Sequence, residues 1–176
     1  NPQELTDLIN KYLTPMTGCV IDNNGTVDKF IGDALMAFWN APIDDEDHRV
    51  NTINCALEMF VLLDKLNIEL KEKDIELRMG IGVNTGDVVV GNMGSNQRFD
   101  YTCLGDAVNL SARLESQTKG YKVGLLLGEQ TKKGIEDKFN FVELDKIAVK
   151  GKTEGIKIYT IIDSHKYVIE HTTFLD

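Results

Sequence analysis

Residues 26–39 contain two apolar stretches separated by the dipeptide Gly32-Asp33. A two-residue turn of this kind between apolar runs predicts a β-hairpin. The hairpin would place the carboxylate of Asp33 at its tip, with Lys29 four residues earlier on the incoming strand. A carboxylate held at a rigid turn suits a hard cation such as Mg²⁺, which takes few protein oxygens. Aspartate is also a common turn former, so a purely structural role for Asp33 is the alternative.

The rest of the chain alternates between helical and strand periodicities. Helices are predicted over residues 1–16, after the acidic residues 44–47, from 106 to 114 and near 130–135. Strands are predicted over residues 77–83, 88–90, 99–104, 123–127 and 141–144, with a final hairpin of 147–149 against 156–162. A glycine-containing loop is predicted at residues 91–96. We therefore expect a single α+β domain spanning residues 1–176, with a mostly antiparallel sheet and helices on one face.

Composition and charge exclude several classes of protein. An apolar fraction of 42% with 3 prolines is typical of a folded domain. No apolar run approaches the length of a membrane span, so we expect a cytoplasmic domain without direct membrane contact, within a parent protein that can itself be membrane-attached. The net charge of −9 disfavours binding of nucleic acid through a broad basic face. The 3 cysteines lack metal-ligand spacing and are expected to be reduced core residues.

Two further clusters of polar residues could bind a small anionic ligand. Asn109 and Arg113 are four residues apart on a predicted helix and would share one face. An amide and a guanidinium there could orient a sugar oxygen and neutralise a phosphate, unless Arg113 only pairs with a surface acid such as Glu115. Lys150 and Lys152 flank a glycine at a predicted hairpin tip, where two ammonium groups could hold terminal phosphates or simply face solvent. No G-x-x-x-x-G-K phosphate loop is present.

Taken together and in this order, these stretches resemble the catalytic domain of class III nucleotidyl cyclases. The matching segments are VDKFIGDALMAFW at 27–39, GIGVNTGD with VGNMG at 80–94, DYTCLGDAVNL with RLE at 100–115, and VKGK at 149–152. The resemblance covers nearly the whole chain. It implies a ferredoxin-like α+β fold that acts as a homodimer with shared active sites.

The same resemblance implies an activity and a cofactor. The family converts a nucleoside triphosphate to its 3′,5′-cyclic monophosphate and pyrophosphate with two Mg²⁺ or Mn²⁺ ions in each active site. Asp33 then corresponds to a ligand of both metal ions. Lys29 and Thr102 correspond to the pair that reads the purine, since lysine can donate to adenine N1 and a threonine hydroxyl can accept from the exocyclic amine.

The resemblance also fixes the expected substrate and the remaining roles. A guanine-reading member would carry an acid at position 29, and threonine at 102 resembles the subgroup that includes bicarbonate-responsive adenylyl cyclases, so ATP is the expected substrate. Asn109 would orient the ribose and Arg113 would stabilise charge at the α-phosphate. Lys150 would hold the β- and γ-phosphates, with Lys152 as the alternative.

One part of the family pattern is not matched. Family members begin with a strand that carries another metal-binding aspartate, and the first strand is missing from these 176 residues. We expect an N-terminally truncated adenylate cyclase domain whose present fragment is inactive or nearly so. The alternatives are a catalytically silent dimerisation or regulatory module, and a guanylate cyclase.

Overall fold

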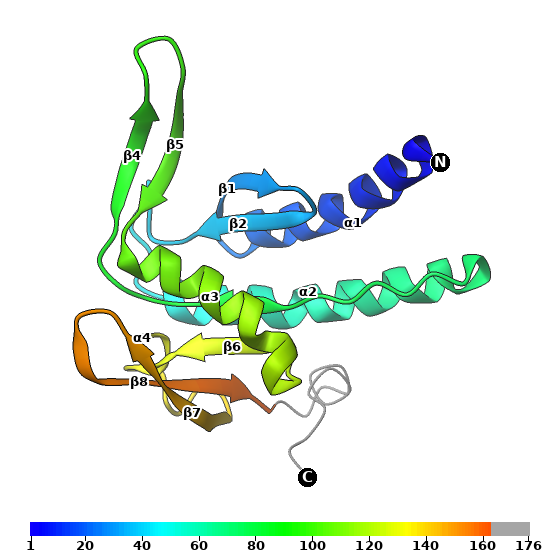
Figure 1. Ribbon diagram of the computed structural model, residues 1–176. Coiled ribbons are helices and arrows are strands. Elements are labelled where there is room, and N and C mark those ends of the chain that lie inside the picture. Colours follow the sequence, from blue (N-terminus) through cyan, green and yellow to red (C-terminus); the bar gives the residue numbers. More distant parts are fainter. Residues whose placement is uncertain (163–176) are drawn as a thin grey trace. The chain divides into compact units, whose positions relative to one another are not determined.

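The structure is a computed structural model, and it describes residues 1–162. The chain divides into two compact units (Figure 1). The first unit comprises Asn1–Arg78 and Val90–Cys103, and the second comprises Met79–Val89 and the chain from Leu104 onward. The residues singled out from the sequence fall into both units.

The first unit is built around two long helices. Its elements are α1 (Pro2–Asp22), β1 (Thr26–Ile31), β2 (Ala34–Phe38), α2 (His48–Leu70), the 3-10 helix η1 (Lys71–Lys73), and most of β4 (Val89–Gly94) and β5 (Phe99–Leu104). Lys11 lies 2.8 Å from Glu69, and the Sγ atoms of Cys19 and Cys55 are 3.4 Å apart. These two contacts show that α1 and α2 pack side by side in opposite directions (Figure 1).

The hairpin predicted at residues 26–39 is confirmed. β1 pairs with β2 in antiparallel register, and Ile31 lies opposite Ala34 across the turn. Gly32 adopts φ +62°, a conformation that glycine reaches without strain. The register shifts between Val27 and Lys29, which indicates a β-bulge at Asp28.

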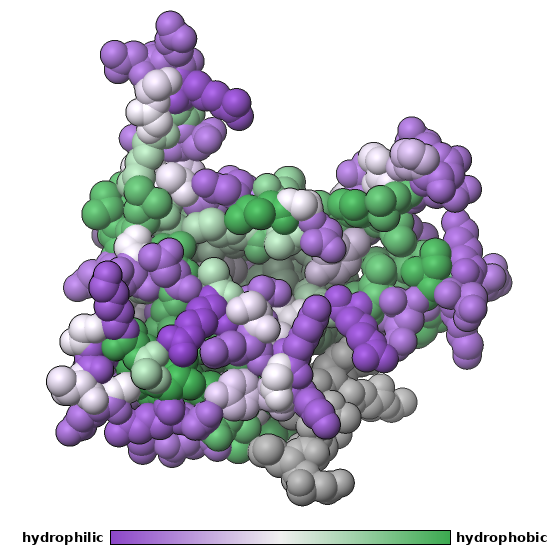
Figure 2. Space-filling model, in the orientation of Figure 1, coloured by the Kyte–Doolittle hydropathy of each residue, from purple (hydrophilic) through white to green (hydrophobic). Residues whose placement is uncertain are grey.

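The prediction of a loop at residues 91–96 is wrong for residues 91–94, because β4 continues through Gly94 and pairs with β5. The two glycines in this segment had suggested irregular backbone, but β5 supplies the hydrogen bonds that keep it extended. The turn that follows is closed by Ser95, whose backbone N–H donates to the carbonyl of Arg98. Figure 2 shows that the tip of the β4–β5 hairpin is hydrophilic. Its strands carry exposed apolar side chains, among them Val89 and Phe99.

The second unit is a four-stranded sheet packed against helices. Its elements are β3 (Ile81–Val83), α3 (Asp106–Tyr121), β6 (Leu125–Gly128), α4 (Glu129–Lys132), β7 (Phe141–Val149) and β8 (Lys152–Ile161). The strand order is β3-β6-β8-β7, with a parallel β3–β6 pair and antiparallel pairs elsewhere in this sheet. The buried core joins α3 to the sheet through Leu114, Val123, Leu126, Ile147, Ile156 and Ile158.

Gly82 explains how closely α3 approaches the sheet. A Cβ atom at this position would lie 2.3 Å from the backbone oxygen of Ser111 and 2.3 Å from the backbone nitrogen of Glu115. The hydroxyl of Ser111 also donates to the carbonyl of Gly82 over 3.0 Å. The absent side chain therefore lets the helix backbone rest directly on β3.

We expect Gly82→Ala to lower the free energy of unfolding by about 1–3 kcal/mol, because helix backbone would have to move. Gly120→Ala is the matched control, since nothing lies within 4 Å of a Cβ there and alanine is the better helix former. Thermal or urea denaturation measures both. An unchanged stability for Gly82→Ala would contradict the close packing.

None of the helices in residues 1–162 combines the length and hydropathy that a bilayer span requires.

Candidate functional site

Asp33 lies at the exposed tip of the β1–β2 hairpin, as predicted. Within residues 1–162, no group of three His, Cys, Asp or Glu side chains is arranged to hold a metal ion. One carboxylate fits a cation that keeps water and phosphate oxygens as its other ligands. Asp33 could therefore supply one carboxylate ligand to a metal ion. Within residues 1–162, no further acidic, histidine or cysteine side chains are grouped with it to complete a site for two ions.

Lys29 and Thr102 are brought together in the first unit through a third residue, Asp28. The Thr102 hydroxyl donates to Oδ2 of Asp28 over 2.6 Å. The Lys29 ammonium lies 3.6 Å from Oδ1 of the same carboxylate. The two residues predicted to act as a pair, 73 positions apart in the sequence, thus share one carboxylate as a common neighbour.

The surroundings of this trio are largely buried. The side chain of Asp28 is 0% exposed and Thr102 is 6% exposed, whereas 43% of the Lys29 side chain is accessible. The backbone N–H of Cys103 also donates to Asp28, over 3.3 Å. Burial, and secondarily the Asp28 charge, raises the pKa of the Cys103 thiol above its usual value. Cys103 is therefore a protonated, packed side chain rather than a nucleophile.

Asn109 and Arg113 lie on α3 in the second unit, both exposed. Gly105 precedes the helix, and its carbonyl accepts from the Asn109 backbone N–H over 3.3 Å. Arg113 does not pair with Glu115, the alternative raised from the sequence. Its Nη1 instead donates to the carbonyl of Ala148 over 2.7 Å, which ties α3 to the end of β7.

That contact brings Arg113 to the segment that leads into the lysine-containing turn. Lys150 and Gly151 form the β7–β8 turn, where Gly151 has φ +84°. Lys152 lies 4.0 Å from Glu129, whereas Lys150 makes no ion pair with any residue in the range 1–162. An exposed ammonium without a carboxylate neighbour is the better candidate to receive a phosphate.

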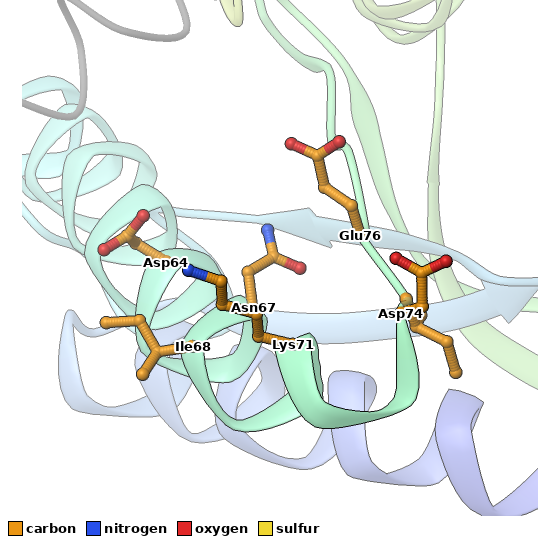
Figure 3. A pocket seen from close by; sticks show the side chains of 7 residues that line it. Asp64, Asn67, Ile68, Lys71, Asp74 and Glu76 are labelled. Carbon is orange, nitrogen blue, oxygen red and sulfur yellow. The ribbon is translucent and has the colours of Figure 1, made fainter.

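A hollow of about 340 Å³ lies at the C-terminal end of α2, and none of the predicted site residues lines it (Figure 3). Its lining includes the acids Asp64, Asp74 and Glu76 together with Lys71. The amide of Asn67 there is already satisfied by the backbone of Leu77. A surface of this charge does not suit a triphosphate, so we do not assign the site to this hollow.

Asp28, which contacts both Lys29 and Thr102, is a residue that the sequence analysis did not single out. In a regular strand, adjacent side chains point to opposite faces. Asp28 and Lys29 were therefore not expected to act at the same site. The bulge in β1 changes that alternation. An acid next to a lysine within an otherwise apolar strand was the one available signal, since such an acid needs a partner when the strand is buried.

The sequence matches the adenylate and guanylate cyclase catalytic domain family over residues 1–163. The chain belongs to this family. The terminal-differentiation specific adenylate cyclase of Dictyostelium discoideum is 35% identical over 167 residues, which is 93% of this chain and 8% of that protein. An adenylate cyclase of Anabaena cylindrica is 34% identical over 168 residues, or 91% of this chain and 32% of its own length. The cyclase domain thus spans a third or less of these curated relatives.

Solved structures confirm the class III cyclase fold of this domain. The crystal structure of the adenylyl cyclase CyaB from P. aeruginosa has a TM-score of 0.82 at 33% identity, covering 94% of this chain and 85% of that one. The guanylyl cyclase Cya2 has the same TM-score of 0.82 at 29% identity, covering 96% of this chain and 86% of that one. The predicted α+β fold class is confirmed, and the fold by itself does not distinguish the two activities.

Proposed function

We propose that this domain is the catalytic part of an adenylate cyclase that converts ATP to 3′,5′-cyclic AMP and pyrophosphate. The observation that carries the proposal is the juxtaposition of Lys29 and Thr102 around one buried carboxylate. An ammonium donates and a hydroxyl can accept, which matches N1 and the exocyclic amine of adenine. The two relatives described above, both adenylate cyclases, support the same choice.

The proposed roles of the remaining residues follow from their chemistry. Asn109 orients the ribose through its amide, and Arg113 stabilises the charge that develops at the α-phosphate. Lys150 holds the β- and γ-phosphates, because its ammonium is exposed and Lys152 already lies beside Glu129. We propose that two copies of the chain form a homodimer and that each active site contains residues of both.

We also propose that the active site takes two Mg²⁺ or Mn²⁺ ions, with Asp33 as a protein ligand. When bound, the ions supply the charge that activates the ribose 3′-hydroxyl and neutralises the triphosphate. Asp33 is suited to this by its exposed position at a rigid turn. We expect the 176 residues by themselves to be inactive or nearly so, and an assay of cyclic AMP formation by this chain measures that.

The test of the proposed function is product formation by the purified full-length protein. We expect cyclic AMP from ATP in the presence of Mn²⁺ or Mg²⁺, and much less cyclic GMP from GTP. A silent dimerisation module would give neither product with either metal. A guanylate cyclase would give mainly cyclic GMP. GTP must be assayed beside ATP, because an adenylyl and a guanylyl cyclase structure match this fold with the same TM-score of 0.82.

Exchanging the base-reading pair should change the substrate. We expect Lys29→Glu combined with Thr102→Ala to lower the ratio of kcat/KM for ATP over GTP by about a hundredfold or more, because an acid accepts from guanine N1 and its amine but repels adenine N1. Lys65→Glu, at an exposed position of α2, is the control for a simple change of charge. Unchanged selectivity would remove the assignment of this pair.

A further inference from the structure

Asp28 occupies an unusual position for a carboxylate. It lies at the bulge in β1, its side chain is 0% exposed, and it faces β5 rather than solvent. Burying an ionised carboxylate is costly unless it is paired and hydrogen-bonded. Three donors from β5 offset part of this cost, all on Oδ2: the hydroxyl of Thr102, the backbone N–H of Cys103 and, over the longer distance of 3.9 Å, the Cys103 thiol.

The bond to Thr102 determines how that hydroxyl can act toward a ligand. A threonine hydroxyl carries one proton and two lone pairs. A carboxylate can only accept, so the single proton points at Asp28 over the short distance of 2.6 Å. Any further partner of the Thr102 hydroxyl then meets lone pairs alone. Asp28 therefore converts a group that could donate or accept into an acceptor.

The other oxygen of the same carboxylate faces Lys29. Oδ1 is buried and has no hydrogen-bond partner among the described residues, and the Lys29 ammonium lies 3.6 Å from it. The attraction keeps the ammonium on the side of the hairpin where Thr102 lies. One carboxylate thus determines the hydrogen-bonding role of both neighbours toward a ligand, so that Lys29 acts as a donor and Thr102 as an acceptor.

We infer that Asp28 is a positioning residue that sets the preference for adenine over guanine through Thr102 and Lys29. Adenine presents an acceptor at N1 and a donor at its exocyclic amine, which match this order. Guanine presents a donor at N1 and an acceptor at O6, which oppose both. This inference rests on the proposed function and adds to it the residue that fixes the direction of the hydrogen bonds.

The test uses Asp28→Asn in the full-length protein. Asp28→Asn keeps the shape of the side chain but removes the negative charge that attracts Lys29 and makes a weaker acceptor for the Thr102 proton, so both neighbours lose the constraint that favours adenine. We expect the ratio of kcat/KM for ATP over GTP to fall by about tenfold to a hundredfold. Asp22→Asn, an exposed acid at the end of α1, is the matched control and should leave the ratio unchanged.

The same substitution made in a Thr102→Val protein distinguishes a role in base selection from simple structural support. In a Thr102→Val protein the hydroxyl is gone, so adding Asp28→Asn should produce much less change in the ratio than it does in the wild type. If the bond only joined β1 to β5, Asp28→Asn would lower the rates for both nucleotides by one factor and leave the ratio unaltered. That result would overturn the inference.

Binding provides a readout that does not depend on turnover. 3′-Deoxy-ATP and 3′-deoxy-GTP lack the attacking hydroxyl, and their dissociation constants can be measured by calorimetry with Mg²⁺. We expect Asp28→Asn to reduce the preference for 3′-deoxy-ATP, and an unchanged preference contradicts the inference. A wild-type protein that binds with this preference but forms no cyclic nucleotide would contradict the proposed activity alone.

Discussion

Replacing Asp33 with asparagine is expected to abolish cyclic AMP formation by the full-length protein. The amide keeps the size and turn-forming capacity of the side chain but removes the negative charge that would bind a metal ion. Loss of a metal contact costs several kcal/mol of transition-state stabilisation, so the rate should fall about a thousandfold or more. Product formation from ATP with Mn²⁺ and with Mg²⁺ measures the effect.

The exposure of Asp33 keeps this test free of folding effects. Its carboxylate lies at the tip of a hairpin and accepts no hydrogen bond that the structure records within residues 1–162. Asp33→Asn should therefore melt within a degree or two of the wild-type protein. Asp22→Asn serves again as the control acid. A variant at position 33 that keeps more than a tenth of the wild-type rate would exclude Asp33 as a metal ligand.

Arg113→Ala should produce the second largest loss. If the guanidinium stabilises the charge that develops at the α-phosphate, its removal should lower kcat by about a hundredfold to a thousandfold, the effect of losing one oxyanion donor. KM for ATP should change much less, because the contact strengthens mainly in the transition state. Steady-state kinetics over a range of ATP concentrations separates the two parameters.

The bond from Arg113 to the carbonyl of Ala148 requires its own control. Arg113→Lys keeps a positive charge but loses the planar fork, so it should recover only part of the lost rate. Lys119→Ala removes an exposed charge from the last turn of the same helix and should be nearly neutral. If Arg113→Ala lowers the melting temperature sharply and raises KM without changing kcat, the residue supports the hairpin and is not catalytic.

The β1–β2 and β7–β8 hairpins were predictable because the residues in their turns favour a tight bend. Gly32 and Gly151 both adopt positive φ between apolar strands, so the sequence marked each bend locally. Element ends were harder to predict. α1 continues past the predicted end at residue 16 to Asp22, even with Pro15 inside it, and α3 continues past Leu114 to Tyr121. Packing of buried side chains, which local propensity does not contain, extends these helices.

The predicted strand over residues 77–83 shows the opposite error. Only Ile81–Val83 forms β3, because β6 is the partner that supplies hydrogen bonds and its register with β3 starts at Ile81. Residue alternation alone cannot indicate where a partner strand begins. The division of the chain into two compact units was likewise not predicted, and the expectation of a single domain stays a prediction.

For the candidate site, the sequence suggested residues but not the contacts that they make in the structure. The pairing of Lys29 with Thr102 through Asp28 depends on a bulge and on a contact between strands 74 residues apart. The bond between Arg113 and Ala148 joins a helix to a strand 35 residues later. Such long-range contacts arise from the fold, so a single sequence without its relatives can only suggest them by family resemblance.

The cysteine and tryptophan side chains, which can serve as natural probes of unfolding, are unevenly distributed between the two units. All 3 cysteines and the single tryptophan, Trp39, belong to the first unit, and the cysteines are buried and free. Thiol labelling rates and indole fluorescence therefore report the opening of that unit, while tyrosines such as Tyr121 and Tyr159 lie in the second. Comparing the indole signal with far-ultraviolet circular dichroism during denaturation would reveal whether the unit that contains Lys29 and Thr102 melts together with the unit that contains Arg113 and Lys150.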